Sequence, residues 1–416
     1  MALLSGCAGG SHDRVTLRFW AMGREGEVVQ ELVRDFEREN PKVRVIVQQI
    51  PWSSAHEKLL TAYVGRSWPD VAQLGNTWVS EFAALKSLEP LDTLAHQSLI
   101  ARDADFGGVW DTNVIDGKLY GIPWYVDTRV LFYRRDLLKA AGYDSIPQSW
   151  DGWRAAMAAI KRRAGQDRYA IFLPTNEWNQ PAIFGLQSGS TLLADDDTRG
   201  DFEGPPFRRA FDFYLGLYRD GYAPPVNNVG IANVYQEFER GTFAMYITGP
   251  WNVGEFRNRL APTTPWATAP LPGPQGAASG VSLAGGSSLV LYRESKHKAE
   301  AWKLIEYLSR TESQVRFSHL SGDLPARRAA WRDSSLVGDP ALRAFETQLT
   351  RVVPTPKIPE WEEIATRLLE QSERAIRGAA PPETALAALD RDVNNILEKR
   401  RWLVERERQR AGTAAR

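Results

Sequence analysis

The stretch Asp116 to Trp153, DGKLYGIPWYVDTRVLFYRRDLLKAAGYDSIPQSWDGW, carries the clearest pattern in this chain. It opens with a polar turn and an aromatic run, Tyr120 to Tyr125, which leads to a single acid, Asp127. The pattern then predicts a β-branched and aromatic strand, Val130 to Tyr133, and an amphipathic helix, Arg135 to Ala141, which a glycine ends because it tolerates positive φ. Aromatic faces beside one carboxylate suit a sugar, whose CH faces stack while its hydroxyl groups donate to the acid.

The bulk composition bounds the class of protein. At 416 residues the chain is too long for one compact core, which predicts two domains or lobes. The hydrophobic share of 43% and the charged share of 25% are ordinary for a soluble globular protein, and a net charge of zero gives no basic field for nucleic acid or an anionic membrane. Fifteen tryptophans outnumber thirteen tyrosines, and many stand in loops. Packing explains most single tryptophans, but several in loops favour a stacking pocket for a flat, polar ligand.

The single cysteine lies near the N-terminus in the sequence Leu4-Ser5-Gly6-Cys7. One cysteine excludes an intramolecular disulfide and a thiolate metal cluster. The motif resembles a bacterial lipobox, in which the cysteine becomes lipidated, so residues 1–13 are predicted to be a lipobox remnant and tether. Too few residues precede it for a signal peptide, so either the start is truncated or Cys7 is an ordinary exposed residue; its place just before the first strand favours truncation. No other stretch approaches the roughly 20 apolar residues of a membrane span.

Strand and helix patterns alternate at the start of the chain. Arg14 to Ala21 reads as a strand, Gly23 to Gly26 as a turn, and Glu27 to Asn40 as a helix that ends before a proline. Two more strand–helix pairs follow, and this succession implies a mainly parallel sheet covered on both faces. Ligands bind beyond the carboxyl ends of such strands, which places on one rim Arg24, Glu25, Trp52, Asn76, Thr77 and Trp78.

A second series of strands and helices occupies the rest of the chain. Glu177 to Gln180 is interpreted as a polar loop, and Pro262 to Gly280, rich in Pro, Gly, Ala and Thr, as an extended connector. Helices are predicted at Glu360 to Arg377 and at Thr384 to Arg400, followed by a charged, frayed tail over residues 405–416.

The order of residues in the opening stretch also resembles a family hallmark, the GKLYGIP…D…LYY…DL…AG…P.TW segment of bacterial extracellular solute-binding proteins of the sugar-binding type. Three other segments resemble motifs of that family: Trp68 to Val71 its PDV strand, Gly241 to Trp251 its GPW turn, and Gly285-Gly286 its late GG block. The resemblance covers nearly the whole chain. It implies an α/β, two-lobed, periplasmic-binding-protein-like (type II) fold whose discontinuous lobes are joined by a hinge.

The resemblance further implies that the chain passes between the lobes near Pro123, Ser282 and Gly322. The N-terminal lobe would be residues 14–123 plus 284–322, and the C-terminal lobe residues 124–283 plus 323–404. Pro123 to Asp127 would then be both hinge and ligand wall, with Arg135 to Trp153 as scaffold.

Asp127 is the strongest single candidate for a ligand contact. The matching acid in sugar-binding relatives accepts hydrogen bonds from hydroxyl groups, and a carboxylate can take two of them side by side; the alternative is an ordinary surface acid before a strand. The resemblance implies that Trp251 packs against a sugar ring, presented by the Gly249-Pro250 turn. Trp178 is predicted to be a stacking platform from the second lobe, and Gly285-Gly286 to let backbone approach the ligand.

For the other candidate ligand contacts, a purely structural role is an equally simple interpretation. Arg24 and Glu25 open a helix, whose N-terminus alone would stabilise a carboxylate, and Trp78 could be helix-start packing. No guanidinium contact is expected from the late proline-rich segment, because Thr355 stands where some relatives carry Arg. The full set of predicted ligand-binding residues is Arg24, Glu25, Asn76, Thr77, Trp78, Tyr125, Asp127, Glu177, Trp178, Trp251, Gly285, Gly286 and Trp361.

Signals for an enzyme or a metal site fail on inspection. Gly280 to Ala284 nearly makes a G-x-S-x-G elbow, but its last residue is Ala and no helix is predicted after it. Asp195 to Gly200 begins like a calcium loop, but Arg199 stands where an oxygen ligand belongs. The five histidines share no metal-binding spacing. No enzyme activity, cofactor or metal is therefore predicted.

These features and the resemblance imply a monomeric sugar-binding component of an ABC importer, located in the periplasm or on the extracellular face and held to the membrane only by a lipid anchor. Its lobes would close around a disaccharide or short oligosaccharide of the maltose or trehalose type and present it to the permease's transmembrane subunits. One alternative is a carbohydrate-active hydrolase, which would need two carboxylates roughly 5 to 10 Å apart. The other is the same fold with a polyamine, phosphorylated polyol or peptide ligand, against which the lack of an obvious charged cluster argues.

Overall fold

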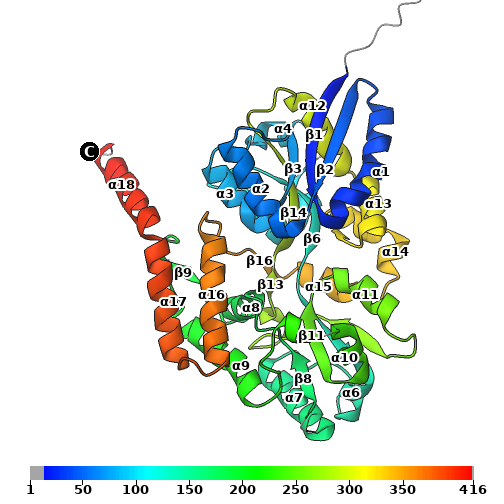
Figure 1. The fold of residues 1–416 in the computed structure, drawn as a ribbon, viewed down its shortest axis with the longest axis vertical. Helices are drawn as coiled ribbons and strands as arrows, with labels where there is room; N and C mark the ends of the chain where they lie inside the picture. The colour runs from blue at the N-terminus through cyan, green and yellow to red at the C-terminus, as the bar shows by residue number, and fades with distance from the viewer. Residues whose placement is uncertain (1–13, 99, 166, 232, 415–416) are drawn as a thin grey trace, which may run out of the picture.

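The chain forms two lobes, one above the other, each built around its own β-sheet (Figure 1). The computed structural model describes residues 14–98, 100–165, 167–231 and 233–414. The predicted two-lobed α/β fold is confirmed. Within these ranges, no helix combines the length and the hydropathy needed to cross a bilayer.

The upper lobe is built on a six-stranded mixed sheet. β1 (Val15–Met22) lies between β2 (Val43–Ile50) and β3 (Val71–Gly75), and both pairings are parallel. The later strands pair antiparallel with their neighbours; they are β14 (Gly285–Leu291), β6 (Ile122–Asp127) and β15 (Leu324–Pro325). The prediction of a mainly parallel sheet is therefore correct only for the first three strands. The final order is β15-β6-β14-β3-β1-β2.

Two apolar clusters hold helices on this sheet. One joins it to α1 (Gly23–Glu39), α12 (Lys298–Leu308) and α13 (Thr311–Ser321), the other to α2 (Trp52–Val64) and α3 (Val79–Ala84).

The turn predicted at Gly23 to Gly26 is wrong, because α1 already begins at Gly23. A Cβ on Gly26 would lie 2.7 Å from the carbonyl oxygen of Ala21, so the missing side chain lets the first turn of α1 pack on β1. The apolar residues after it are buried at helical spacing, as the pattern predicted.

The lower lobe contains a four-stranded sheet in the order β12-β7-β11-β8. Its strands are β12 (Trp266–Ala269), β7 (Val130–Arg134), β11 (Phe243–Thr248) and β8 (Tyr169–Phe172). β12 lies inside the stretch predicted to be an extended connector, so that prediction is wrong in part. Trp266 stacks on Phe132 with 5.8 Å between ring centroids, and this contact helps to hold β12 as an antiparallel edge strand on β7.

Helices surround the lower sheet and continue to one side of it. They are α6 (Arg135–Ala140), α7 (Trp150–Ala164), α8 (Asn179–Gln187), α9 (Pro205–Arg219), α10 (Val234–Arg240), α11 (Trp251–Arg259), α15 (Arg343–Leu349), α16 (Trp361–Ile376) and α17 (Pro382–Ile396). The polar loop predicted over Glu177 to Gln180 is half helix, since α8 begins at Asn179.

Shorter elements complete the described chain. They are α4 (Asp92–His96), α5 (Gly107–Asp111), α14 (Ser334–Val337), η1 (Asn76–Trp78), η2 (Arg102–Ala104), η3 (Asn228–Gly230), η4 (Ala277–Ser279), η5 (Arg328–Arg332), β4 (Val114–Ile115), β5 (Lys118–Leu119), β9 (Leu193–Ala194), β10 (Arg199–Gly200), β13 (Ser282–Leu283) and β16 (Val352–Val353).

The strand pairing shifts two of the predicted passages between lobes. β6 and β15 both belong to the upper sheet, so the chain leaves that sheet after Asp127 and after Pro325, later than expected. The first two passages run side by side: the Thr128 hydroxyl in one donates a hydrogen bond to the Leu283 carbonyl oxygen in the other at 2.8 Å. The first two of the segments that link the sheets are thus tied to each other.

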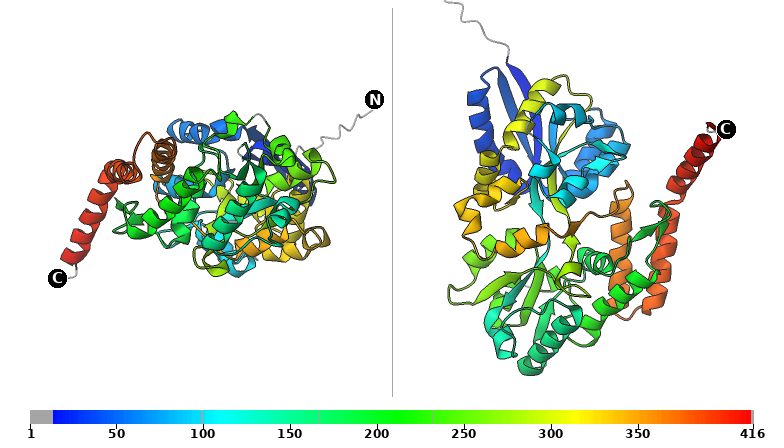
Figure 2. Two further views of the ribbon diagram at one scale, coloured as in Figure 1. Left: turned by 90° about the horizontal axis from the view of Figure 1, so that it is seen from below. Right: turned by 180° about the vertical axis from the view of Figure 1, so that it is seen from behind.

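The described part of the predicted charged tail, residues 405–414, is helical. α18 (Glu398–Ala414) continues from α17 and projects away from the body, at the height of the upper lobe (Figures 1 and 2). Its base is fixed to the β9–β10 turn, where the Arg400 Nε donates to the Asp197 carbonyl oxygen at 3.0 Å. Arg, Glu and Gln are good helix formers, so the charged composition that predicted fraying also supports a helix.

Candidate functional site

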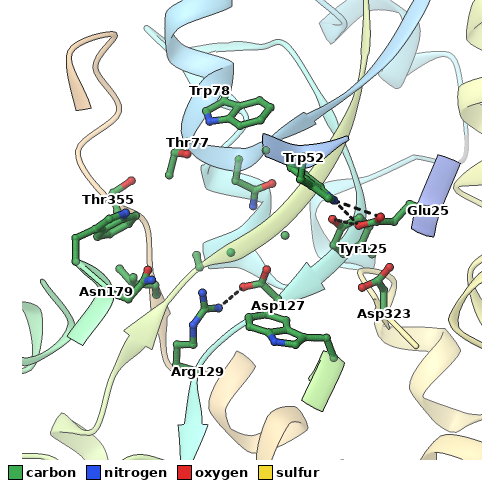
Figure 3. A pocket seen from close by; sticks show the side chains of 18 residues that line it. Glu25, Trp52, Thr77, Trp78, Tyr125, Asp127, Arg129, Asn179, Asp323 and Thr355 are labelled. Carbon is green, nitrogen blue, oxygen red and sulfur yellow. Dashed lines mark hydrogen bonds and ion pairs between the residues drawn. The ribbon is translucent and has the colours of Figure 1, made fainter. Parts of the chain in front are cut away.

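A cleft of about 540 Å³ lies between the lobes, lined by residues from both (Figure 3). Its upper wall comes from α1, α2, η1, β6 and β14, and its lower wall from the starts of α8 and α11. Most of these segments follow directly on a strand. The sheet topology thus brings residues far apart in sequence to one place, as the rule for ligand sites in open α/β sheets predicts.

Four tryptophans face this cleft, two from each lobe. Trp52 and Trp78 belong to the upper lobe, with 5.7 Å between their ring centroids. Trp178 and Trp251 belong to the lower lobe. A ligand held between them would meet aromatic faces from both sides, which suits a ring with apolar CH faces.

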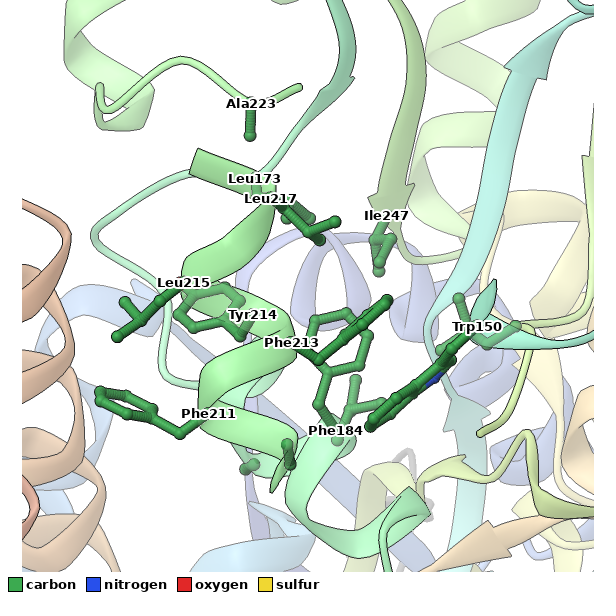
Figure 4. Close-up of a cluster of buried hydrophobic side chains, with 14 of the residues drawn as sticks. Trp150, Leu173, Phe184, Phe211, Phe213, Tyr214, Leu215, Leu217, Ala223 and Ile247 are labelled. Carbon is green, nitrogen blue, oxygen red and sulfur yellow. The ribbon is translucent and has the colours of Figure 1, made fainter. Parts of the chain in front are cut away.

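Trp178 is carried by a well-packed helix. It directly precedes α8, and Phe184 of α8 packs edge-on against Phe213 of α9 with 5.5 Å between ring centroids. Trp150 stacks on Phe213 at 4.1 Å within the same buried cluster (Figure 4). Because this core is dense, Trp178 stands on a rigid base.

Glu25 is a buried acid in the first turn of α1. Its Oε1 accepts a hydrogen bond from the Tyr125 hydroxyl at 2.8 Å, and the Trp52 Nε1 lies 3.3 Å from both carboxylate oxygens. Gln73 and Ser287 in turn donate to the Tyr125 oxygen at 3.2 and 3.0 Å. Burial raises the pKa of Tyr125 well above its usual value, so this hydroxyl keeps its proton and remains a donor. The network fixes Glu25 as an oriented acceptor.

Asp127 is held by a neighbour two residues along the chain. The Arg129 Nη1 donates to its Oδ1 at 3.0 Å, and the same guanidinium lies 4.6 Å from the ring centroid of Trp251. A Cβ on Gly249 would lie 2.0 Å from the Trp251 ring, so the ring rests against bare backbone. Arg129 therefore links the acid and the aromatic platform of the cleft.

Asp323 adds a third carboxyl group to the same wall. Burial, followed by the charge of Glu25, raises its pKa to about 8. Figure 3 shows it beside Glu25, with Asp127 further along the wall.

Backbone and amide groups complete the wall. A Cβ on Gly285 would lie 2.1 Å from the Asp127 Oδ1, and Gly286 has φ of +116°, which favours glycine. Asn76 is buried; its Oδ1 accepts from the Ser288 hydroxyl at 3.3 Å, while its Nδ2 has no partner within the described part of the chain. This buried amide is an unsatisfied donor in the cleft wall.

The model of the family described as bacterial extracellular solute-binding protein matches residues 21–315. The chain belongs to this family. A solved structure of the sugar-binding protein MalE from Xanthomonas citri is 51% identical to this solute-binding protein, covers 94% of it and 99% of its own chain, and superposes with a TM-score of 0.91. A Thermotoga lettingae ABC transporter solute-binding protein, solved with α-D-tagatose, is 26% identical over 92% of this chain and 100% of its own, with a TM-score of 0.77. The galactooligosaccharide-binding protein of Bacillus subtilis is 25% identical over 88% of this chain and 86% of its own.

Family and relatives are binding proteins, so this solute-binding protein is a binding protein and not an enzyme. The hydrolase alternative is thereby set aside.

The structure brings most of the predicted site residues of this solute-binding protein to the cleft. Those that line it are Glu25, Asn76, Thr77, Trp78, Tyr125, Asp127, Trp178, Trp251, Gly285 and Gly286.

Three predicted residues lie outside the lining. Arg24 is exposed and pairs with Glu27 at 2.8 Å, because it lies on the solvent side of the first turn of α1. Glu177 accepts hydrogen bonds from Gln180 and Asn228, which hold the loop before α8. Trp361 is fully buried behind Trp178, edge-on at 5.5 Å, and so supports that ring from the rear. Cys7, the predicted lipidation site, lies outside the described residues.

Other residues of the cleft were not among the predicted contacts; they are Trp52, Gly75, Arg129, Asn179, Leu283, Ala284, Asp323 and Thr355. Trp52 was placed on the correct rim, and Arg129 stands two residues after Asp127, so both carried a usable signal. Asp323 follows Gly322 at a predicted passage. Thr355 lines the cleft without a guanidinium, as expected, but Arg129 supplies one from another segment.

Proposed function

We propose that this protein is the extracytoplasmic sugar-binding component of an ABC importer, and that it takes a disaccharide or short oligosaccharide of the maltose or trehalose type. The ligand binds in the interlobe cleft, the lobes close around it, and the closed form is what the permease's transmembrane subunits recognise. The protein works as a monomer, with its two lobes as the moving units.

One observation carries the proposal: two tryptophans from each lobe and a set of fixed acceptors and donors face one cleft. Stacking from both sides suits a pyranose ring, and Asp127 and Glu25 accept from its hydroxyl groups. The guanidinium of Arg129 and the amide of Asn76 donate to its oxygens. Four tryptophans offer more stacking area than one ring needs, which favours at least two sugar units.

The relatives support a sugar rather than another solute. MalE from Xanthomonas citri is named a sugar-binding protein, the Thermotoga lettingae protein was solved with α-D-tagatose, and the Bacillus subtilis relative is named for galactooligosaccharide.

Anchoring through Cys7 is part of the proposal. The lipobox-like motif around it supports a lipid-modified N-terminus, and a Streptomyces antibioticus relative that is 28% identical over 356 residues is named a lipoprotein. Partition into detergent of the protein expressed in its bacterial host, and loss of that partition in Cys7→Ser, would test the anchor.

Calorimetric titration of the purified chain tests the ligand class. We expect saturable, one-site binding of maltose, trehalose or a close relative, with no cleavage of the sugar on prolonged incubation. Binding only of a polyamine, a phosphorylated polyol or a peptide would overturn the sugar assignment and leave the fold and family in place. Turnover of a disaccharide would overturn the binding-protein assignment.

A further inference from the structure

Three carboxyl groups from three different segments meet on one wall of the cleft. Glu25 comes from α1, Asp127 from β6, and Asp323 from the turn between α13 and β15. Arg129 is the one lysine or arginine among the residues described as lining this cleft, and it pairs with Asp127. The wall is therefore richer in acids than the single guanidinium can balance.

The three acids have different hydrogen-bond partners. Glu25 accepts from Tyr125 and Trp52, and Asp127 accepts from Arg129. In the part of the chain that the structure describes, the Asp323 side chain hydrogen-bonds only with Ser321. Among the described residues, no ion pair involves Asp323. Its backbone N–H donates to the Ser321 hydroxyl at 3.0 Å just after α13 ends, and its side chain lies at the cleft (Figure 3).

The groups that face Asp323 favour its neutral form. Glu25 on α1 and Asp127 on β6 are acids, and the Tyr125 hydroxyl already donates to Glu25. Ionising a third carboxyl group here would place like charges together in a partly buried site. In line with this geometry, burial and Glu25 raise the pKa of Asp323 to about 8.

We propose that Asp323 is a specificity-determining residue that meets the sugar as a neutral carboxylic acid and donates a hydrogen bond to a ligand oxygen. A sugar hydroxyl both donates and accepts, whereas ring and glycosidic oxygens only accept. Glu25 and Asp127 accept hydrogen bonds on this wall, and a protonated Asp323 adds a donor beside them, in addition to Arg129 and Asn76 elsewhere in the cleft. This inference rests on the proposed function, because it requires a bound sugar.

The test is the affinity for the sugar that binds best, of maltose and trehalose, measured by calorimetry across pH. If only the neutral acid binds, a pKa of about 8 makes the affinity fall about tenfold between roughly pH 6 and pH 9. Near pH 8, binding should also take up about half a proton per sugar, which appears as a dependence of the heat on buffer ionisation enthalpy. In Asp323→Asn, which keeps a donor and does not titrate, we expect near wild-type affinity at low pH, a flat profile and no proton uptake.

Asp105→Asn is the matched control. Asp105 is a buried acid outside the cleft, and burial raises its pKa to about 7, so it titrates in a similar range; its variant should keep the wild-type slope. A flat wild-type profile without proton uptake, or a slope that survives in Asp323→Asn, would overturn the role of Asp323 alone. If no sugar binds at any pH, the proposed function fails together with it.

Discussion

Trp251→Ala removes the most exposed of the four cleft tryptophans, whose side chain is 44% exposed. A tryptophan carries up to about 250 Å² of surface, so roughly 110 Å² remains for a ligand and the closing lobe to cover. At about 25 cal/mol per Å² this area is worth about 2 to 3 kcal/mol. We therefore expect the sugar Kd to rise about 30- to 150-fold.

Calorimetry measures the change in Kd, and a thermal melt checks the fold. The melting temperature should change little, because the ring packs on Arg129 and bare backbone rather than in a core. Trp402→Ala is the matched control: Trp402 is 52% exposed, but it lies on α18, away from the cleft. Unchanged affinity in Trp251→Ala, or an equal loss in Trp402→Ala, would refute the stacking role.

Three further variants test other parts of the site. Arg129→Gln removes the partner of Asp127 and should weaken sugar binding about tenfold with secondary structure, followed by circular dichroism, unchanged; equal affinity would mean that the guanidinium has no part in binding. Gly286→Ala should lower the melting temperature by several degrees, because its Cβ would lie 2.3 Å from a carbonyl oxygen of β6 at a φ of +116°, and an unchanged melt would contradict this close approach. The hydrogen bond to Glu81 raises the pKa of His56, so the stability gained from this pair is fully present below about pH 6.5 and is lost as the pH rises through the folded-state pKa. His56→Gln should therefore lower the melting temperature more at about pH 6 than at about pH 9. The reverse order would be inconsistent with this pairing.

Local patterns predicted much of the fold because periodicity and helix ends are local properties. The helix after β7 and its glycine stop are where the opening stretch placed them. The mixed direction of the upper sheet could not be predicted this way, since it depends on strands that return from residues 285 and 324 to pair beside β3 and β6. The same long-range pairing keeps all of β6 in the upper sheet, so the chain leaves that sheet after Asp127 and not near Pro123.

The site residues also divide into those that local patterns could place and those that depend on the folded chain. Residues at the ends of strands, such as Glu25 and Trp78, could be placed on the cleft because strand ends share an edge, whereas Trp251 was placed there by the resemblance of its turn to the family's GPW motif. Arg24 and Trp361 differ from their predictions because helix phase decides which side of α1 or α16 faces the cleft, and sequence order alone leaves that open. Asp323 was missed because its role depends on two other acids that only the folded chain brings near it.

A crystal structure of the protein grown with saturating maltose or trehalose tests the central claim most directly. We expect one sugar molecule between the two lobes, with Trp52 and Trp78 on one side and Trp178 and Trp251 on the other, and Asp127 within hydrogen-bond distance of a hydroxyl group. Sugar bound elsewhere with this cleft empty, or in the cleft without contact to any of these rings, would contradict it.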